Sequence, residues 1–279
     1  MLSKRAKILK PSPTLAMAAR ARDLESKGHD VVSLTVGEPD WPTFKVANQA
    51  AIKAINEDFT KYTAAAGILD LREEIAKQCS QNLGLKYFAN EVVVGAGAKF
   101  ILFAALQMLV DEGDEVIIPA PYWVSYPAMV DLAGGVNKII ACGKEDNFKL
   151  TAENLKKNIS NKTKVIILCS PSNPTGMVHT SKELYEIAQV LKEYPNVFVL
   201  SDDIYDHLIF SDKKRAPHLL DVAPELKDRV LIVNGASKTY AMTGWRVGWG
   251  VGPLALMKPM ADFCSQSTSN VTSISQKAV

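Results

Sequence analysis

Residues 164–205 read KVIILCSPSNPTGMVHTSKELYEIAQVLKEYPNVFVLSDDIY, and this stretch decides the fold class. An apolar, β-branched run, Lys164–Cys169, leads into a turn rich in serine, proline and glycine. A helical pattern follows at Lys182–Tyr194, and then a second apolar run at Val197–Ser201. Two short apolar strands joined by a helix of more than ten residues are typical of a parallel βαβ unit.

The same alternation extends along most of the chain. Further strands are predicted at Glu91–Val94, Glu115–Pro119 and Arg229–Val233, and further helices at Lys99–Val110 and Ser125–Leu132. We therefore predict an α/β fold with a mainly parallel central sheet and helices on both faces. Ligands of such sheets bind beyond the carboxyl ends of the strands, so the residues that follow each strand are the candidates for a site.

Composition excludes several classes of function. The 279 residues suit one large α/β unit or two modest domains. Lysine and arginine number 32 against 30 aspartate and glutamate, so the charge balance indicates neither a nucleic-acid partner nor an anionic membrane. Four scattered cysteines and four dispersed histidines form no metal motif, and no metal is predicted. No apolar segment is long enough to span a bilayer. The cysteine pattern and the lack of a secretory signal favour the cytoplasm.

Polar and aromatic residues follow each of the five predicted strands. In chain order these segments are Gly95-Ala-Gly-Ala-Lys99, Pro121-Tyr-Trp-Val-Ser-Tyr126, Ser170-Pro-Ser-Asn-Pro-Thr-Gly176, Asp202-Asp-Ile-Tyr205 and Asn234-Gly-Ala-Ser-Lys238. Structural turns explain the glycines and prolines. They do not explain an Asn, Asp, Tyr, Trp and Lys at successive strand ends, so we predict one functional rim of the sheet.

Several residues of this rim have side chains suited to binding a small charged ligand. Gly95-Ala-Gly97 precedes a predicted helix and suits one phosphate group, although a plain strand-to-helix turn is the alternative. Phe100 at the third glycine position disfavours a dinucleotide. A desolvated lysine such as Lys238 is the residue type that forms Schiff bases. Arg246 can hold a phosphate with two hydrogen bonds. A buried Asp202 needs a cationic partner, and a pyridinium nitrogen would be one.

Several motifs resemble those of one enzyme family. Ser237–Arg246 (SKTYAMTGWR) is similar to the lysine signature of the class I, fold-type I, pyridoxal-phosphate-dependent aminotransferases. Ser172–Gly176 (SNPTG) and Ser201–Tyr205 (SDDIY) match two further motifs in the order of that family. Gly37–Asp40 (GEPD) and Pro121–Tyr126 (PYWVSY) most resemble the bacterial aspartate aminotransferase branch, which includes enzymes that also accept prephenate.

The resemblance implies pyridoxal 5′-phosphate (PLP) as cofactor and a role for each matching residue. Lys238 would bind the cofactor covalently and then act as the general base. Asp202 would pair with the pyridinium nitrogen, Tyr205 and Asn173 would hydrogen-bond the 3-oxygen, and Trp123 would stack on the ring. Lys238, Asp202 and Tyr205 are therefore the expected catalytic residues. The expected phosphate ligands are Gly97, Ala98, Ser237, Arg246 and, from the neighbouring subunit, Tyr62.

The resemblance also implies the substrate contacts. Gly37, Trp123 and Asn173 would lie near the substrate α-carboxylate. Lys99 stands where related enzymes often carry a hydroxyl residue, and in the bacterial branch such a lysine helps to bind the distal carboxylate of aspartate or glutamate. Lys10 matches a position linked to prephenate use. The implied reaction is ping-pong transfer of an amino group between L-aspartate, glutamate or prephenate and a 2-oxo acid such as 2-oxoglutarate.

The domain organisation is inferred from the same resemblance. Residues 1–36 would form an N-terminal arm and part of a small domain, and residues 37–279 would form the PLP-binding large domain, truncated at its C-terminal end. The rest of the small domain, with the arginine that clamps the α-carboxylate, would then be absent. Sharing of Tyr62 implies a homodimer with shared active sites. Two alternatives stay open: an aromatic or alanine aminotransferase or other PLP enzyme of the same fold, and a non-catalytic PLP-binding module.

Overall fold

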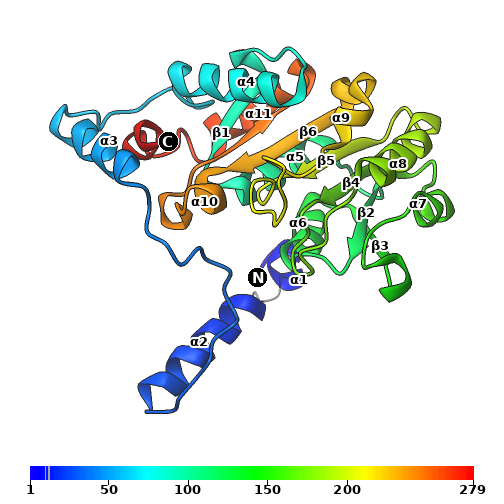
Figure 1. Cartoon of the computed structure of the whole chain (residues 1–279), viewed down its shortest axis with the longest axis horizontal. Coiled ribbons are helices and arrows are strands. Elements are labelled where there is room, and N and C mark those ends of the chain that lie inside the picture. The colour runs from blue at the N-terminus through cyan, green and yellow to red at the C-terminus, as the bar shows by residue number, and fades with distance from the viewer. Residues whose placement is uncertain (10, 12) are drawn as a thin grey trace.

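The computed structural model describes residues 1–9, 11 and 13–279. In this part of the chain seven strands form one sheet in the order β1-β7-β6-β5-β4-β2-β3 (Figure 1). Their bounds are β1 Val92–Gly95, β2 Glu115–Ala120, β3 Val136–Ala141, β4 Thr163–Cys169, β5 Phe198–Asp202, β6 Val230–Gly235 and β7 Gly248–Val251. Only β7 runs antiparallel to its neighbours, so the other six strands end at the same rim. The predicted mainly parallel α/β sheet is confirmed.

Helices cover both faces because successive strand residues point to opposite sides. Val93, Ile118 and Ile167 belong to one apolar core, whereas Val94 and Ile117 belong to the other. The first core is covered by α5 (Ala98–Leu109), α6 (Ser125–Ala133) and α11 (Leu254–Ser267). The second is covered by α4 (Leu69–Leu83), α7 (Ala152–Asn158), α8 (Ser181–Glu193) and α9 (Leu219–Val222). The predicted helices at 99–110, 125–132 and 182–194 thus correspond to α5, α6 and α8.

The remaining helices lie at the ends of the chain and near the rim. Helix α2 (Pro13–Ser26), preceded by α1 (Lys4–Ile8), extends away from the sheet (Figure 1). Helix α3 (Lys45–Asn56) packs beside α12 (Ser273–Ala278), although the two are far apart in sequence. The four-residue helix α10 (Ala236–Thr239) follows β6 directly. Short 3₁₀ turns occupy Ala89–Glu91, Lys144–Asp146, Pro224–Arg229 and Thr243–Trp245. No helix in the described ranges is long and apolar enough to cross a membrane.

Two strands were not predicted, and one of them shapes the rim. Strand β3 is an edge strand with mostly exposed or half-exposed residues, so it carries no apolar run. Strand β7 reads Gly-Trp-Gly-Val, a weak strand pattern. A Cβ on Gly248 would overlap the backbone of Gly97 and Ala98, so this position needs glycine for the close approach. This close contact places β7 against the start of α5, and it places Arg246, two residues before β7, next to Gly97.

Candidate active site

Asp202 ends β5 at the centre of the rim and is 3% exposed. The Tyr126 hydroxyl donates to its Oδ2 at 2.6 Å, and the Ile204 amide lies 3.4 Å from its Oδ1. Burial raises the pKa of Asp202 to about 6, and the negative charge of Asp203 acts in the same direction. No basic side chain within the described residues forms an ion pair with Asp202. A buried carboxylate in this state is poised to take a cationic partner.

Lys238 lies in α10, just beyond the end of β6. Its Nζ donates to the carbonyl oxygen of Gly37 and lies 5.9 Å from the centroid of the Tyr205 ring. Burial lowers the pKa of Lys238, the Arg246 charge lowers it further, and Glu38 opposes both. A lowered pKa increases the fraction of neutral amine, which is the nucleophilic form. The lowered pKa of Lys238 therefore favours nucleophilic addition of its amine to a carbonyl carbon.

Tyr205 and Asn173 bring two polar groups to the same rim from different strand ends. The Asn173 side-chain amide donates to the Tyr205 hydroxyl oxygen at 3.1 Å. Burial raises the pKa of Tyr205, so its hydroxyl keeps the proton and can donate in turn. Together the two side chains offer an amide N–H and a phenolic O–H to an oxygen of a ligand. The motifs predicted both residues as ligands of the cofactor 3-oxygen, and their side chains lie within hydrogen-bond distance of each other.

An anion-binding corner lies where α5 begins. Gly97 caps this helix with a φ of 89°, and a Cβ there would overlap the Arg246 guanidinium. Arg246 donates to the Thr243 carbonyl at 2.7 Å and to the Ala96 carbonyl at 3.2 Å. The Ala98 and Lys99 N–H groups at the start of α5, next to a guanidinium, are suited to a phosphate, whereas the Gly97 N–H donates to the Gly95 carbonyl at 2.7 Å. Ala98 is the first residue of α5, and the buried Ser237 lies in α10 next to Lys238.

Trp123 and Lys99 form the side of the site next to α6. The Lys99 ammonium lies 4.7 Å from the centroid of the Trp123 ring, a cation–π distance. Burial lowers the pKa of Lys99, and the nearby charge of Arg246 adds to the effect. The Trp123 ring meets the Tyr126 ring edge-on at 5.4 Å. Lys99 is thus a cation next to the aromatic ring that was predicted to stack on the cofactor.

Two predicted residues are not joined to this group. Tyr62 is 90% exposed, and in the described part of the chain no hydrogen bond links it to the other site residues. Lys10 lies outside the described residues. Tyr126, which is 2% exposed and donates to Asp202, is not among the site residues predicted from the sequence. Tyr126 belongs to the Pro121–Tyr126 segment that the sequence singles out, but only the fold shows that its side chain points toward β5.

Replacing Tyr126 with phenylalanine removes only the hydroxyl that donates to Asp202. This hydrogen bond lowers the pKa of Asp202, so its loss is expected to raise that pKa by roughly one to two units, the equivalent of about 1.5–3 kcal/mol for a hydrogen bond to a charged group. Side-chain carboxyl NMR across pH 4–8 measures the change. Tyr122→Phe, in the same segment, is the matched control. An unchanged Asp202 titration in Tyr126→Phe would contradict the assigned contact.

The described side chains fit PLP group by group. A phosphate matches Arg246 and the start of α5, an aldehyde matches Lys238, and a phenolic oxygen matches Asn173 and Tyr205. The ring nitrogen matches Asp202, whose burial without an ion-pair partner otherwise costs free energy. A parallel α/β sheet with this rim has the architecture of PLP-dependent transferases.

Comparison with known proteins identifies the family. The family model "Aminotransferase class I and II" matches residues 29–279. A relative from Rickettsia felis, described as a "Probable aspartate/prephenate aminotransferase", is 48% identical over 278 residues, covering 100% of this chain and 68% of the relative. The "Aspartate aminotransferase" of Geobacillus stearothermophilus is 47% identical, covering 99% of this chain and 70% of the relative. The crystal structure of an aspartate aminotransferase from Rhizobium meliloti has a TM-score of 0.95 and 41% identity, covering 100% of this chain and 69% of that one.

The chain therefore belongs to the class I and II aminotransferase family. Aminotransferases of the aspartate aminotransferase type in this family use PLP, so the cofactor inferred from the motifs is confirmed at the level of the family.

Proposed function

We propose that the protein moves an amino group between L-aspartate or glutamate and a 2-oxo acid such as 2-oxoglutarate, and that prephenate also serves as an acceptor. The convergence of Lys238, Asp202 and Arg246 on one rim, with Lys99 beside them, is the observation that carries the proposal. The relatives named for aspartate and for aspartate/prephenate support the choice of substrates.

In a ping-pong transfer, the cofactor and Lys238 have separate roles. When bound, PLP supplies an aldehyde that takes up the amino group and a ring that withdraws electrons. Lys238 would hold that aldehyde through its Nζ, and the same amine would act as the general base that takes the proton from the substrate Cα. Burial of Lys238 supports both roles, because it lowers the pKa of the amine toward neutrality.

Asp202, Tyr205 and Asn173 hold the polar atoms of the cofactor ring. The Asp202 carboxylate keeps the ring nitrogen protonated, because a buried anion within hydrogen-bond reach stabilises the cationic form. The paired donors of Asn173 and Tyr205 bind the ring oxygen. At the other end, Arg246 and Ser237 with the backbone of Gly97 and Ala98 bind the phosphate, and Trp123 stacks on the ring.

Gly37 and Lys99 contact the substrate in this proposal. The segment that contains Gly37 lies close over Lys238, since the Gly37 carbonyl accepts from Nζ. Lys99 supplies a cation beside Trp123 for the distal carboxylate of a dicarboxylic substrate. We further assign Trp123 and Asn173 to the region of the α-carboxylate, as the motifs imply. Lys10 is retained as a substrate residue on sequence grounds alone.

We also propose a homodimer in which Tyr62 reaches the phosphate of the other subunit. The 90% exposure of Tyr62 in a single chain supports this assignment, because it leaves the side chain accessible to a partner subunit. Residues 1–36 would serve as arm and part of a small domain, and residues 37–279 as the large domain. The outward course of α2 supports this division (Figure 1). The four free cysteines agree with a reducing, cytoplasmic location.

The direct test of the activity is spectroscopic. The protein is loaded with PLP, and the visible absorbance of the cofactor is recorded before and after aspartate, glutamate, alanine and phenylalanine are added in parallel. We expect aspartate and glutamate to shift the spectrum and to yield the corresponding 2-oxo acids. A spectrum that no amino acid shifts would favour a non-catalytic PLP-binding module, and a preference for alanine or phenylalanine would favour the other aminotransferases.

Lys99→Ala is expected to impair dicarboxylic substrates selectively. A charge-assisted hydrogen bond is worth about 1.5–3 kcal/mol, so kcat/KM for aspartate should fall roughly 10- to 150-fold. The value for alanine should change little, because alanine has no distal carboxylate. Lys99→Arg, which keeps the positive charge, is the matched control and should retain more of the aspartate activity. An equal loss for aspartate and alanine would assign Lys99 to the phosphate or to the α5 loop instead.

A further inference from the structure

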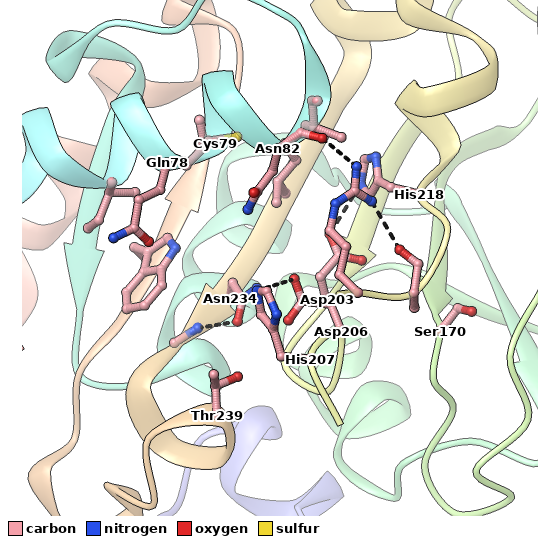
Figure 2. Close-up of a pocket in the computed structure, with 18 of the residues that line it drawn as sticks. Gln78, Cys79, Asn82, Ser170, Asp203, Asp206, His207, His218, Asn234 and Thr239 are labelled. Carbon is pink, nitrogen blue, oxygen red and sulfur yellow. Dashed lines mark hydrogen bonds and ion pairs between the residues drawn. The ribbon is translucent and has the colours of Figure 1, made fainter. Parts of the chain in front are cut away.

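A cavity lies between α4 and the start of α9, on the face of the sheet that α4, α8 and α9 cover. Figure 2 shows Cys79, Asp203, Asp206 and His218 among the residues that line it. None of them takes part in the mechanism proposed above. Asp203 and His218 are 6% and 7% exposed, so the cavity wall holds buried titratable groups that need an explanation.

Asp203 is the immediate neighbour of Asp202 but faces the other way. Its amide donates to the Val233 carbonyl at 2.8 Å, which ties the chain just after β5 to β6. Its Oδ1 accepts from the Ser201 hydroxyl at 2.9 Å. Its Oδ2 lies 3.1 Å from His218 Nε2, an ion-pair distance, although the angle is not that of an aligned hydrogen bond. One carboxylate therefore faces the cofactor side while the next faces His218.

The orientation of His218 is set by its own neighbours. Its Nδ1 accepts from the Leu220 amide at 3.0 Å, so the ring proton resides on Nε2, which faces Asp203. Its backbone amide donates to Asp221 Oδ2 at 2.8 Å. Arg215 binds both oxygens of Asp221, at 2.6 and 2.9 Å. The Arg215–Asp221 pair thus fixes the segment that presents the imidazole to Asp203.

The other groups that face Asp203 do not replace this imidazole. Asp206 brings a second carboxyl, whose pKa is raised to about 6 by burial first and by the Asp203 charge next. Burial raises the pKa of the Cys79 thiol on α4 to about 12, which keeps it neutral. The Arg215 guanidinium is engaged with Asp221. Within the described residues, the Ser201 hydroxyl donates to Oδ1 of Asp203, and the His218 imidazole is the ring that faces Oδ2.

We propose that Asp203 and His218 form a positioning pair that holds a fixed negative charge and an anchored backbone behind Asp202, so that Asp202 binds a cationic ring nitrogen more tightly. The proposal rests on the role given to Asp202 above. Like charges in a poorly solvated region oppose ionisation of each other, and both are stabilised when a cation enters. The direction agrees with the Asp203 charge raising the pKa of Asp202.

Asp203→Asn and His218→Ala test the pair in the cofactor-free protein. Carboxyl NMR follows the titration of Asp202, assigned with Asp202→Asn. We expect Asp203→Asn to lower the Asp202 midpoint by about one unit, and to weaken the Kd for PLP about tenfold, since one pKa unit corresponds to a tenfold change. His218→Ala should act in the same direction, because the Asp203 side chain is then no longer held in its place behind Asp202. His218→Gln restores a donor and should recover most of the effect.

The control variant is Cys79→Ala, which alters the same cavity without changing its charge. It should move neither the Asp202 midpoint nor the Kd for PLP. Thermal unfolding of every variant separates a loss of stability from a change in charge. The pair would be reduced to a structural role, and the proposal overturned, if Asp203→Asn and His218→Ala lower stability but leave the Asp202 midpoint in place. A wild-type chain that does not bind PLP would refute the proposed function, while the NMR titration would still decide the coupling of Asp203 to Asp202.

Discussion

Lys238→Ala is expected to abolish transamination while leaving weak binding of PLP. The variant loses both the covalent attachment and the amine that moves the Cα proton. General acid–base catalysis alone contributes about 10²–10⁴-fold, so the combined loss should reach about 10⁴-fold or more. The phosphate contacts of Arg246 and the start of α5 do not involve Lys238, so cofactor binding should persist at reduced affinity. Steady-state turnover of aspartate and equilibrium titration with PLP measure the two effects separately.

Chemical labelling gives the same assignment an independent test. Borohydride treatment of the PLP-loaded wild type should fix the cofactor on the peptide that contains Lys238, and Lys238→Ala should give no such adduct. Lys258→Ala removes an exposed lysine of α11 and serves as the matched control, with wild-type labelling and turnover. Lys99, also a lysine of the rim, is the informative competitor. An adduct on Lys99 would overturn the assignment of Lys238.

The regular part of the fold could be predicted because apolar strands in a parallel sheet are continuous and distinct. The run at Lys164–Cys169 lies within β4, and the run at Val197–Ser201 matches β5 to within a residue. Strand β7 was not predicted because its glycines allow a close contact with α5 and leave little apolar pattern in the sequence. Strand β3 was not predicted because it is an edge strand that buries few side chains, so its sequence has no apolar run. Periodicity reports burial, so it fails where backbone contacts decide the structure.

The site shows a similar division. Lys238, Asp202, Asn173 and Arg246 could be named from sequence because each follows a strand or lies in a motif with a chemical reason for that residue type. Tyr126 could not, because its contact with Asp202 depends on how α6 starts and on the order β5-β4-β2 in the sheet. Residues two strands apart in the sheet and 76 positions apart in sequence leave no local pattern.

Asp202→Asn is expected to depress transamination while stabilising the cofactor-free protein. An amide cannot keep the ring nitrogen protonated, and removal of an opposite charge within hydrogen-bond reach shifts a pKa by about 1–3 units. At neutral pH turnover should therefore fall roughly 10- to 1,000-fold. Aspartate turnover at pH 7 measures this loss. Near-normal rates with the natural cofactor would refute the role of Asp202.

The stability of the same variant gives a readout that does not depend on catalysis. Burial raises the pKa of Asp202 from its ordinary value of 3.8 to about 6, so ionisation favours the unfolded chain. The wild type should lose stability from this group as the pH rises from about 4 to above 6, by about 2–3 kcal/mol, and Asp202→Asn should not. Denaturant unfolding of both cofactor-free proteins at pH 4 and pH 8 tests this.

The free energy of unfolding of the variant, relative to that of the wild type, should be higher at pH 8 than at pH 4. At pH 8 only the wild type buries an ionised carboxylate. PLP should reverse the order at pH 8, because the wild-type carboxylate acquires its cation and the amide does not. If the stability difference is the same at both pH values, ionised Asp202 does not destabilise the cofactor-free protein, and a cationic cofactor has no such destabilisation to remove.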